Sequence, residues 1–230
     1  MRELRATSEG DGGHLRDLYQ ARFDERELAF KREMWRVLCE HFFQRYVKQT
    51  DTVLDLGAGT CEFINSIKCE RKLAVDLNPD LAKHAIDAEP LQADSTDMSS
   101  VRSQSVDVIF CSNFFEHMPT KEHLLRSLAE CERVLRAGGT LIVLQPNIRY
   151  LPGRYWDFFD HHTPLTHLSM VEALRLSGFV PREVVPRFLP YTVKDRRIPH
   201  SLPLVRAYLR LRPLWRIFGR QMLVVAERQP

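Results

Sequence analysis

A turn with two glycines marks the first candidate ligand site of this chain. The segment VLDLGAGTCEF, residues 53–63, begins with a short apolar run and continues through Gly57 and Gly59. Dinucleotide-binding turns follow the pattern G-x-G-x-x-G, and their third glycine lets a helix pack tightly on the strand while the pyrophosphate lies at its N-terminus. Glu62 occupies that third position here, and a carboxylate there would repel a phosphate. The turn therefore favours a nucleoside ligand that carries no phosphate.

Carboxylates near the turn indicate the chemistry of that ligand. Asp76 follows Gly59 by 17 residues and ends the next apolar run. As an ionised acceptor it suits both hydroxyls of a ribose. Asp55, just before the glycines, and Glu62 favour a positively charged group such as an ammonium or sulfonium. Asp94, in the segment QADSTD, adds a polar group that we expect on the same rim. A cationic nucleoside without phosphate fits these residues, and S-adenosylmethionine is such a molecule.

Alternating strands and helices are needed to bring these residues together. Apolar runs typical of strands covered on both faces occur at residues 52–56, 72–76, 90–94, 106–110 and 139–145. A helical spacing of apolar residues extends from about residue 15 to residue 48. Another covers 121–136, which Gly138 and Gly139 are expected to cap. The alternation predicts a doubly wound α/β fold with a parallel sheet, whose ligand lies beyond the C-terminal ends of the strands.

The pattern changes after Pro146. Residues 147–168 are rich in aromatic side chains and histidine and show no clear period. A helix is predicted at 169–177, followed by strands at 182–188 and 221–227. We interpret residues 1–50 as an N-terminal helical cap and residues 51–230 as one domain with an elaborated acceptor side. A basic insertion is expected at about residues 190–220.

Composition excludes several classes of protein. The chain of 230 residues is 44% hydrophobic and 27% charged, as is typical of a globular domain with a sizeable core. It has no apolar run of the roughly 18 residues that span a bilayer. The N-terminus has no apolar segment typical of a secretory signal. Its five cysteines are scattered without a C-x-x-C pair, which predicts reduced thiols in the cytoplasm and argues against a disulfide framework or a zinc site.

Several segments together resemble the motifs of class I S-adenosylmethionine-dependent methyltransferases of the type 11 kind. VLDLGAGTC is similar to their motif I, AVDLNP to the acidic ribose-binding motif II and QADSTD to the adenine-contacting motif III. VDVIFCSNFFEHM and RVLRAGGTLIVLQPN resemble the segments that follow, so the likeness covers residues 50–147 in order. The third position of motif I, often glycine in the family, is Cys61 here. The resemblance implies a Rossmann-like, seven-stranded sheet, mostly parallel with an antiparallel last strand, and helices on both faces.

The same resemblance implies S-adenosylmethionine as the cofactor and assigns residues to it. Gly57 and Gly59 would flank the methionine part, beside Asp55. Motif II, with Asp76 and Leu77, would hold the ribose. The remaining contacts would be Asp94 and Ser95 to the adenine, and Ser112 and Asn113, with the neighbouring Phe114, beneath the sulfonium.

Histidines are the candidates for acting on the acceptor. Methyl transfer to an alcohol benefits from a general base, most often histidine, because the hydroxyl proton must leave as the new bond forms. In the segment DFFDHHTPLTH, residues 157–167, we predict His161 or His162 as this base, with Asp160 orienting it; His117 is the third candidate. The alternative is that these histidines only fix the loop. A metal site formed by Asp160, His161, His162 and His167 is disfavoured, because the spacing matches no recognised ligand pattern.

Two further groups are assigned to the pocket, each with an alternative. Tyr19 and Arg22 are expected to close over the cofactor from the N-terminal helix, or else to lie on a solvated helix face. Four aromatic residues are expected either to line the acceptor pocket or to pack in the core: Tyr150, Trp156, Phe158 and Phe159.

Positive charge is concentrated near the C-terminus. Residues 194–220 carry eight Lys and Arg against one acid, a net +7, whereas the rest of the chain sums to −4. Within residues 202–218 the arginines recur at helical spacing among apolar side chains. One interpretation is contact with an anionic membrane, where a lipid-linked acceptor would be found. The alternative is a solvated basic face. Nucleic acid is not expected, since the rest of the chain is acidic and has no RNA-binding motif.

These observations predict a methyltransferase that acts on the oxygen of a sugar, glycan or other small hydroxylated acceptor. The aromatic segment and the C-terminal tail are similar to methyltransferases of bacterial polysaccharide biosynthesis, and a cytoplasmic, membrane-associated location would suit that role. One alternative is a C- or N-methyltransferase of lipids, quinones or natural products. A nicotinamide-dependent dehydrogenase is disfavoured by Glu62. The non-enzymatic alternative is a scaffold that binds S-adenosylmethionine without catalysis.

Overall fold

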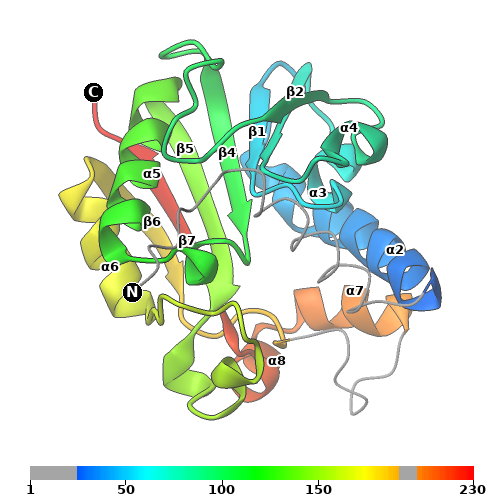
Figure 1. Ribbon diagram of the computed structural model, residues 1–230. Helices are drawn as coiled ribbons and strands as arrows, with labels where there is room; N and C mark the ends of the chain where they lie inside the picture. The colour runs from blue at the N-terminus through cyan, green and yellow to red at the C-terminus, as the bar shows by residue number, and fades with distance from the viewer. Residues whose placement is uncertain (1–24, 192–200) are drawn as a thin grey trace, which may run out of the picture.

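The computed structural model describes residues 25–191 and 201–230. Seven strands form one sheet in the order β3-β2-β1-β4-β5-β7-β6 (Figure 1). Their bounds are β1 Thr52–Leu56, β2 Arg71–Asp76, β3 Glu89–Gln92, β4 Val106–Ser112, β5 Leu135–Pro146, β6 Phe179–Val185 and β7 Gln221–Arg228. The last strand, β7, runs antiparallel to β5 and β6, and the other neighbours are parallel. The predicted fold class, including the antiparallel last strand, is confirmed.

Helices cover both faces of the sheet. They are α2 Glu25–His41, α3 Glu62–Ser66, α4 Leu81–His84, α5 Lys121–Val134, α6 His167–Leu176, α7 Leu202–Arg210 and α8 Arg212–Phe218. The described residues also form four short 3-10 helices: η1 Phe43–Tyr46, η2 Phe115–His117, η3 Ile148–Tyr150 and η4 Arg154–Asp157. One hydrophobic core joins the sheet to α5 and α6. A second, on the opposite face, joins it to α2, α3, α4, α7 and α8 (Figure 1).

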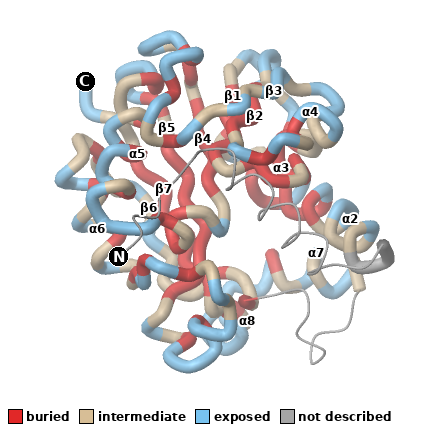
Figure 2. The backbone as a smooth tube through the Cα atoms, in the orientation of Figure 1, coloured by how far each residue is buried: buried red, intermediate tan, exposed pale blue. Residues whose placement is uncertain are grey.

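The apolar strands follow from this double cover. Successive side chains of a strand point to opposite faces, and in β1 Leu54 and Leu56 belong to the α5 side whereas Val53 belongs to the α2 side. Both faces are therefore buried, as the continuous red centre of Figure 2 shows. Asp55 shares the face of Val53, so its carboxyl lies on the α2 side, next to the turn that follows β1.

One boundary predicted from the sequence was wrong. Gly138 and Gly139 do not cap the helix before them, because α5 ends at Val134 and Leu135 already begins β5. Residues 136–139 form an irregularity between two parallel pairs, Val106 with Leu135 and Val108 with Thr140. Gly138 takes a positive φ of 74° in this bulge. Gly138 and Gly139 therefore lie in a bulge within β5. Glycine is favoured in such bulges as well as at helix ends.

Two other boundaries differ by a few residues. β3 ends at Gln92, so Asp94 lies two residues beyond the strand rather than at its end. β6 begins at Phe179 and ends at Val185, earlier than the predicted 182–188. Within the predicted helix at 15–48 the structure describes α2 and η1, and residues 15–24 lie outside the described part of the chain.

The predicted basic insertion contains two helices between β6 and β7. Pro213 is in the first turn of α8, where its missing N–H needs no partner and where it separates α8 from α7. Helix α7 lies beside α2 and shares its core (Figure 1). Among the described helices, none is long and apolar enough to cross a membrane.

Removing one methylene from the sheet core is expected to cost stability. Ile109 in β4 is fully buried, so Ile109→Val should lower the free energy of unfolding by about 0.5–1.5 kcal/mol, measured by urea denaturation. Ile86, which is 84% exposed, is the matched control, and Ile86→Val should stay within about 0.5 kcal/mol of the parent. Equal losses in the two variants would contradict the assignment of Ile109 to the core.

Candidate active site

The glycine turn is held against the end of β2. The backbone N–H groups of Gly57 and Ala58 donate to the carbonyl of Val75 at 2.9 and 3.1 Å. The Gly59 N–H donates to Oδ2 of Asp76 at 2.7 Å, and the Asn78 N–H donates to Oδ1 of the same carboxylate at 2.8 Å. Asp76 therefore lies beside the turn and also holds it in place through these hydrogen bonds. Since each carboxylate oxygen keeps a further lone pair, both can still accept from ribose hydroxyls.

The position of Gly57 leaves no room for a side chain. Its φ is +71°, and a Cβ built there would lie 2.4 Å from Cδ2 of Phe114. Phe114 follows β4, so this contact joins the turn after β1 to the loop after β4. Cys61, at the end of the turn, is buried and also has a positive φ of 62°. It thus adopts the conformation for which glycine is preferred at the third motif position.

Negative charge gathers around the turn. Burial raises the pKa of Asp55 well above its ordinary value, and the carboxylates of Glu62 and Asp76 raise it further, whereas the Ile64 N–H and Lys31 lower it. Burial likewise raises the pKa of Asp76, against the hydrogen bonds from Gly59 and Asn78. A cationic ligand would relieve this repulsion.

Lys31 is a residue of this site that the sequence did not reveal. Its Nζ lies 3.0 Å from Oε1 of Glu62 across the α2–α3 contact, and the Thr60 hydroxyl donates to the same oxygen at 2.6 Å. Glu62 is thus partly neutralised by the protein, which leaves Asp55 as the buried acid beside the cavity. The signal that could have found Lys31 is its place on a helix that precedes the turn, but spacing alone did not distinguish it from other lysines.

One cavity connects the turn with the predicted acceptor side. Its volume is about 670 Å³, a size suited to a cofactor and part of a second substrate. Predicted site residues in its lining are Asp55, Gly57, Gly59, Ser112, Asn113, His117, Phe158 and His161. Further parts of the wall come from α2, α7, α8 and residues 189–191.

Other predicted site residues lie outside this lining. Asp76 is not among the lining residues, although it accepts a hydrogen bond from the Gly59 N–H of the turn. Leu77 is 42% exposed. Asp94 is exposed and accepts from the backbone N–H and hydroxyl of Thr96, both at 2.8 Å, while Ser95 is buried. Tyr19 and Arg22 lie outside the described residues.

The acceptor-side histidines are brought together by a loop that docks on η2. The backbone N–H groups of His162 and Thr163 donate to the Glu116 carbonyl at 2.8 and 3.0 Å. The Thr163 hydroxyl donates to the Met118 carbonyl at 2.6 Å. These bonds place His161 beside His117, with ring centroids 5.0 Å apart. His162 is exposed instead, because adjacent residues of an extended loop point to opposite sides.

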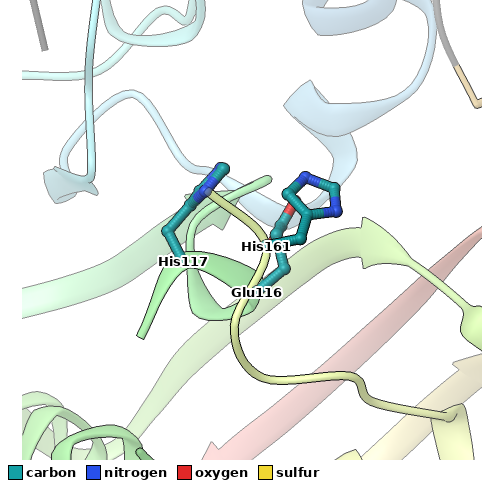
Figure 3. A group of neighbouring side chains, drawn as sticks. All are labelled: Glu116, His117 and His161. Atoms are coloured by element: carbon teal, nitrogen blue, oxygen red, sulfur yellow. The ribbon is translucent and has the colours of Figure 1, made fainter. Parts of the chain in front are cut away.

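Glu116, His117 and His161 form one cluster (Figure 3). One oxygen or nitrogen atom from each lies within 4.8 Å of the others, so the three could hold a metal ion. All three line the cavity. Burial raises the pKa of Glu116 to about 7; His117 lowers it and Asp160 raises it. Sequence reasoning missed Glu116 because a glutamate beside a histidine has no distinguishing pattern.

Asp160 orients His117. Nδ1 of His117 lies 2.9 Å from the backbone carbonyl of Asp160 and 3.2 Å from its Oδ2. Burial lowers the pKa of His117, but the contacts with Asp160 and the charge of Glu116 outweigh it, so the pKa is raised overall. Asp160, which the sequence predicted to orient His161 or His162, thus contacts the third candidate, His117. A neutral His117 that donates from Nδ1 has its Nε2 lone pair left for another partner.

Of the four predicted aromatic residues, Phe158 lines the cavity and the other three are not in its lining. Phe158 lines the cavity and stacks on His161 at 5.0 Å. Trp156 is 55% and Phe159 93% exposed, and neither is in the lining. Tyr150 stacks on His167, whose Nδ1 lies 3.0 Å from the Asn147 amide nitrogen, away from the histidine cluster. Tyr191, which the sequence did not single out, also lines the cavity.

Comparison with known proteins agrees with this geometry. Residues 54–143 match the family model described as a methyltransferase domain. These residues include the end of β1, the glycine turn, Asp76 and the cluster residues of η2. By this match, residues 54–143 belong to the methyltransferase domain family. S-adenosylmethionine, the cofactor predicted from the sequence, would suit the acidic surroundings of the turn.

Relatives of the methyltransferase domain share part of the chain. A probable S-adenosylmethionine-dependent methyltransferase of Mycobacterium tuberculosis is 27% identical over 68% of this chain and 59% of its own length. A probable methyltransferase of Aspergillus luteorubrus is 26% identical over 44% of this chain and 41% of its own. The chain thus matches between about two fifths and three fifths of the length of these relatives.

Solved structures with this domain show the same fold. A protein from Haloferax volcanii, solved with the methyltransferase activator Trm112, has a TM-score of 0.66 at 22% identity and covers 90% of this chain and 95% of its own. A methyltransferase dependent on S-adenosylmethionine from Archaeoglobus fulgidus has a TM-score of 0.62 at 19% identity, covering 86% and 94%. At such identities the likeness concerns the fold of the methyltransferase domain.

Proposed function

We propose that this protein transfers a methyl group from S-adenosylmethionine to an oxygen of a sugar, glycan or other hydroxylated acceptor. The observation that carries the proposal is the single cavity that joins the glycine turn and Asp55 to the cluster of Glu116, His117 and His161. Cofactor and acceptor would thus occupy one site, each against residues suited to it.

The chemistry of the transfer explains why the cluster favours oxygen as the acceptor atom. The methyl group moves in line between nucleophile and sulfur, so alignment in a pocket sheltered from water supplies much of the rate. An amine or thiolate needs little more. An alcohol must also lose its proton, and the polar groups able to promote this step stand at the cluster. Of the predicted histidines we propose His117 and His161 for this role, since His162 is exposed and outside the cavity lining.

The remaining walls of the cavity suggest the rest of the acceptor. Helices α7 and α8 and their junction contribute apolar side chains to it, among them Leu204, Leu211, Leu214 and Phe218. A hydroxylated head group attached to an apolar chain would match a polar cluster at one end and these side chains at the other. A lipid-linked sugar has this character, which agrees with a role in polysaccharide biosynthesis.

Two measurements test the proposed function. Calorimetric titration should show saturable binding of S-adenosylhomocysteine and none of NAD. Incubation with S-adenosylmethionine labelled in its methyl group should then label the hydroxyl oxygen of sugar nucleotides or lipid-linked oligosaccharides. Binding of NAD instead of S-adenosylhomocysteine would favour the dehydrogenase. Cofactor binding without transfer to any acceptor would favour a scaffold, and label on carbon or nitrogen would favour the other methyltransferase classes.

We also propose that α7 and α8 rest on an anionic membrane surface, with the protein in the cytoplasm. Arg206, Arg210, Arg212 and Arg216 are all exposed there. Four apolar side chains of the same helices and their junction are about half exposed: Leu204, Leu211, Ile217 and Phe218. Arginines beside exposed apolar groups are suited to anionic head groups and the outer part of the acyl region.

Sedimentation with vesicles tests this contact. The protein should bind vesicles that contain phosphatidylglycerol, should release them at high salt and should not bind phosphatidylcholine alone. Because each arginine near the surface contributes about 1 kcal/mol, the double variant Arg210→Gln/Arg212→Gln should bind roughly 30-fold more weakly. Arg175→Gln, an exposed arginine on α6, is the control and should bind like the parent. Equal binding by all three proteins would remove the proposal.

A further inference from the structure

We propose that Glu116, His117 and His161 bind a divalent metal ion, with an open coordination position for the acceptor hydroxyl. The inference rests on the proposed function, because it assigns the chemistry of the acceptor half of the same cavity. It begins from a set of three potential ligands whose donor atoms all lie within 4.8 Å of one another (Figure 3).

The first observation is a buried carboxylate that lacks a hydrogen-bond partner. Glu116 is 2% exposed, and its Oε2 accepts no hydrogen bond from any residue in the described parts of the chain. Buried polar atoms of native proteins are almost always satisfied, and a bound ion is one of the few explanations for an exception. Leaving the carboxylate in this state is costly. A cation shared with the two imidazoles would remove the cost.

The second observation is the way His117 is held. Metal-binding histidines usually donate their other ring N–H to a carboxylate or a backbone carbonyl, which fixes the tautomer and strengthens the ligand. Nδ1 of His117 meets both groups, the carbonyl of Asp160 at 2.9 Å and its carboxylate at 3.2 Å. The Nε2 atom is thereby the one left for a metal, and Asp160 becomes a positioning residue for the site.

The third observation is the composition of the set. Two histidines and one glutamate form the ligand set of several catalytic zinc sites, in which three protein ligands leave one position for water or substrate. Imidazole favours zinc, iron, cobalt and related ions over magnesium and calcium. The three residues also line the cavity, so the remaining position would face the space in which the acceptor must lie.

A cation there would account for the loss of the hydroxyl proton. Held by this metal ion, the acceptor hydroxyl would have a lowered pKa and would release its proton to solvent. This oxygen then attacks the methyl carbon of S-adenosylmethionine. The new C–O bond forms as the C–S bond breaks, and its electron pair stays on sulfur. The products are the methyl ether, neutral S-adenosylhomocysteine and one proton, with no change in oxidation state.

Metal binding is measured on the tag-free full chain after treatment with a chelator. Titration with zinc in competition with a fluorescent zinc indicator should give one site per chain, and Co²⁺ should give visible absorption typical of a low-coordinate site. Glu116→Gln and His161→Gln should each weaken zinc binding at least about 100-fold. Asp160→Asn should weaken it about 10–100-fold, as other changes to groups that orient metal ligands do. His162→Gln, the neighbouring exposed histidine, is the matched control and should bind zinc like the parent.

Each protein is also titrated with S-adenosylhomocysteine. This titration shows that the variants are folded, and it distinguishes a failure of the metal proposal from a failure of the proposed function. Zinc binding lost in Glu116→Gln and His161→Gln but kept in His162→Gln, with cofactor binding unchanged, supports the metal site. Two results overturn it: absence of saturable zinc binding in a parent that still binds the cofactor, or zinc binding that survives both substitutions. A parent that fails to bind S-adenosylhomocysteine overturns the proposed function instead, whatever the zinc result.

Discussion

Asp76→Ala is expected to lower the affinity for S-adenosylhomocysteine by at least about 100-fold in a calorimetric titration. The loss corresponds to two hydrogen bonds from ribose hydroxyls to an ionised carboxylate, each contributing about 1.5–3 kcal/mol. The substitution also removes the acceptor of the Gly59 N–H, which is held at 2.7 Å. Loss of that bond would loosen the turn on which the methionine part is expected to rest.

Three comparisons isolate the role of Asp76. Asp76→Asn keeps the shape and one acceptor oxygen, so it should retain more affinity than Asp76→Ala. Asp87→Ala is the control, since Asp87 is 82% exposed and pairs with Lys72 away from the turn. It should bind the cofactor like the parent. Unchanged affinity in Asp76→Ala would contradict the assignment of the cofactor site to this rim of the sheet.

The pH dependence of binding gives an independent check of the same carboxylate. Burial raises the pKa of Asp76, and the ionised form is the one that accepts from the ribose. Affinity should therefore be complete above the raised pKa and should fall as the pH decreases through it. The fall should begin at a higher pH than the ordinary range of an exposed aspartate, about 4. The Asp76→Asn variant should lack this part of the profile.

The cofactor half of the site could be predicted from sequence because its geometry is local. Gly57, Gly59 and Asp76 lie at the ends of adjacent parallel strands, and apolar runs suffice to place such ends at one edge of a sheet. Cys61 shows how far this reasoning extends, since a residue other than glycine takes the positive φ expected of the third motif position. Its identity weakened the motif, but the backbone conformation is the one the turn requires.

The acceptor half could not be predicted residue by residue, because long-range contacts determine it. Whether His161 or His162 enters the cavity depends on how one loop meets η2. The bonds that decide this run from backbone N–H groups to the Glu116 carbonyl, and backbone groups leave no sequence signal. For the same reason Asp160 contacts His117, which is far away in the sequence. Lys31 reaches Glu62 through the packing of α2 on α3, which also lies beyond any local pattern.

Gly57→Ala is expected to weaken binding of S-adenosylhomocysteine and to lower the free energy of unfolding by about 2–5 kcal/mol. The positive φ contributes about 1–2 kcal/mol, since a Cβ is disfavoured in this conformation. The remainder comes from a clash, because the new Cβ would lie 2.4 Å from Cδ2 of Phe114, and forcing an extra methyl into a packed site costs about 1–3 kcal/mol. Urea denaturation and calorimetric titration measure the two effects.

The chain supplies a matched control and a means to separate the two causes. A Cβ at Gly153 would meet no heavy atom within 4 Å, and its φ of −97° is open to any residue, so Gly153→Ala should behave like the parent. Adding Phe114→Ala to Gly57→Ala would remove the clash but not the strain in φ. Relative to Phe114→Ala alone, the Gly57 substitution should then cost only the part due to φ. A full cost in both backgrounds would assign the effect to the backbone. No cost in either background would contradict both the strain in φ and the approach of the turn to Phe114.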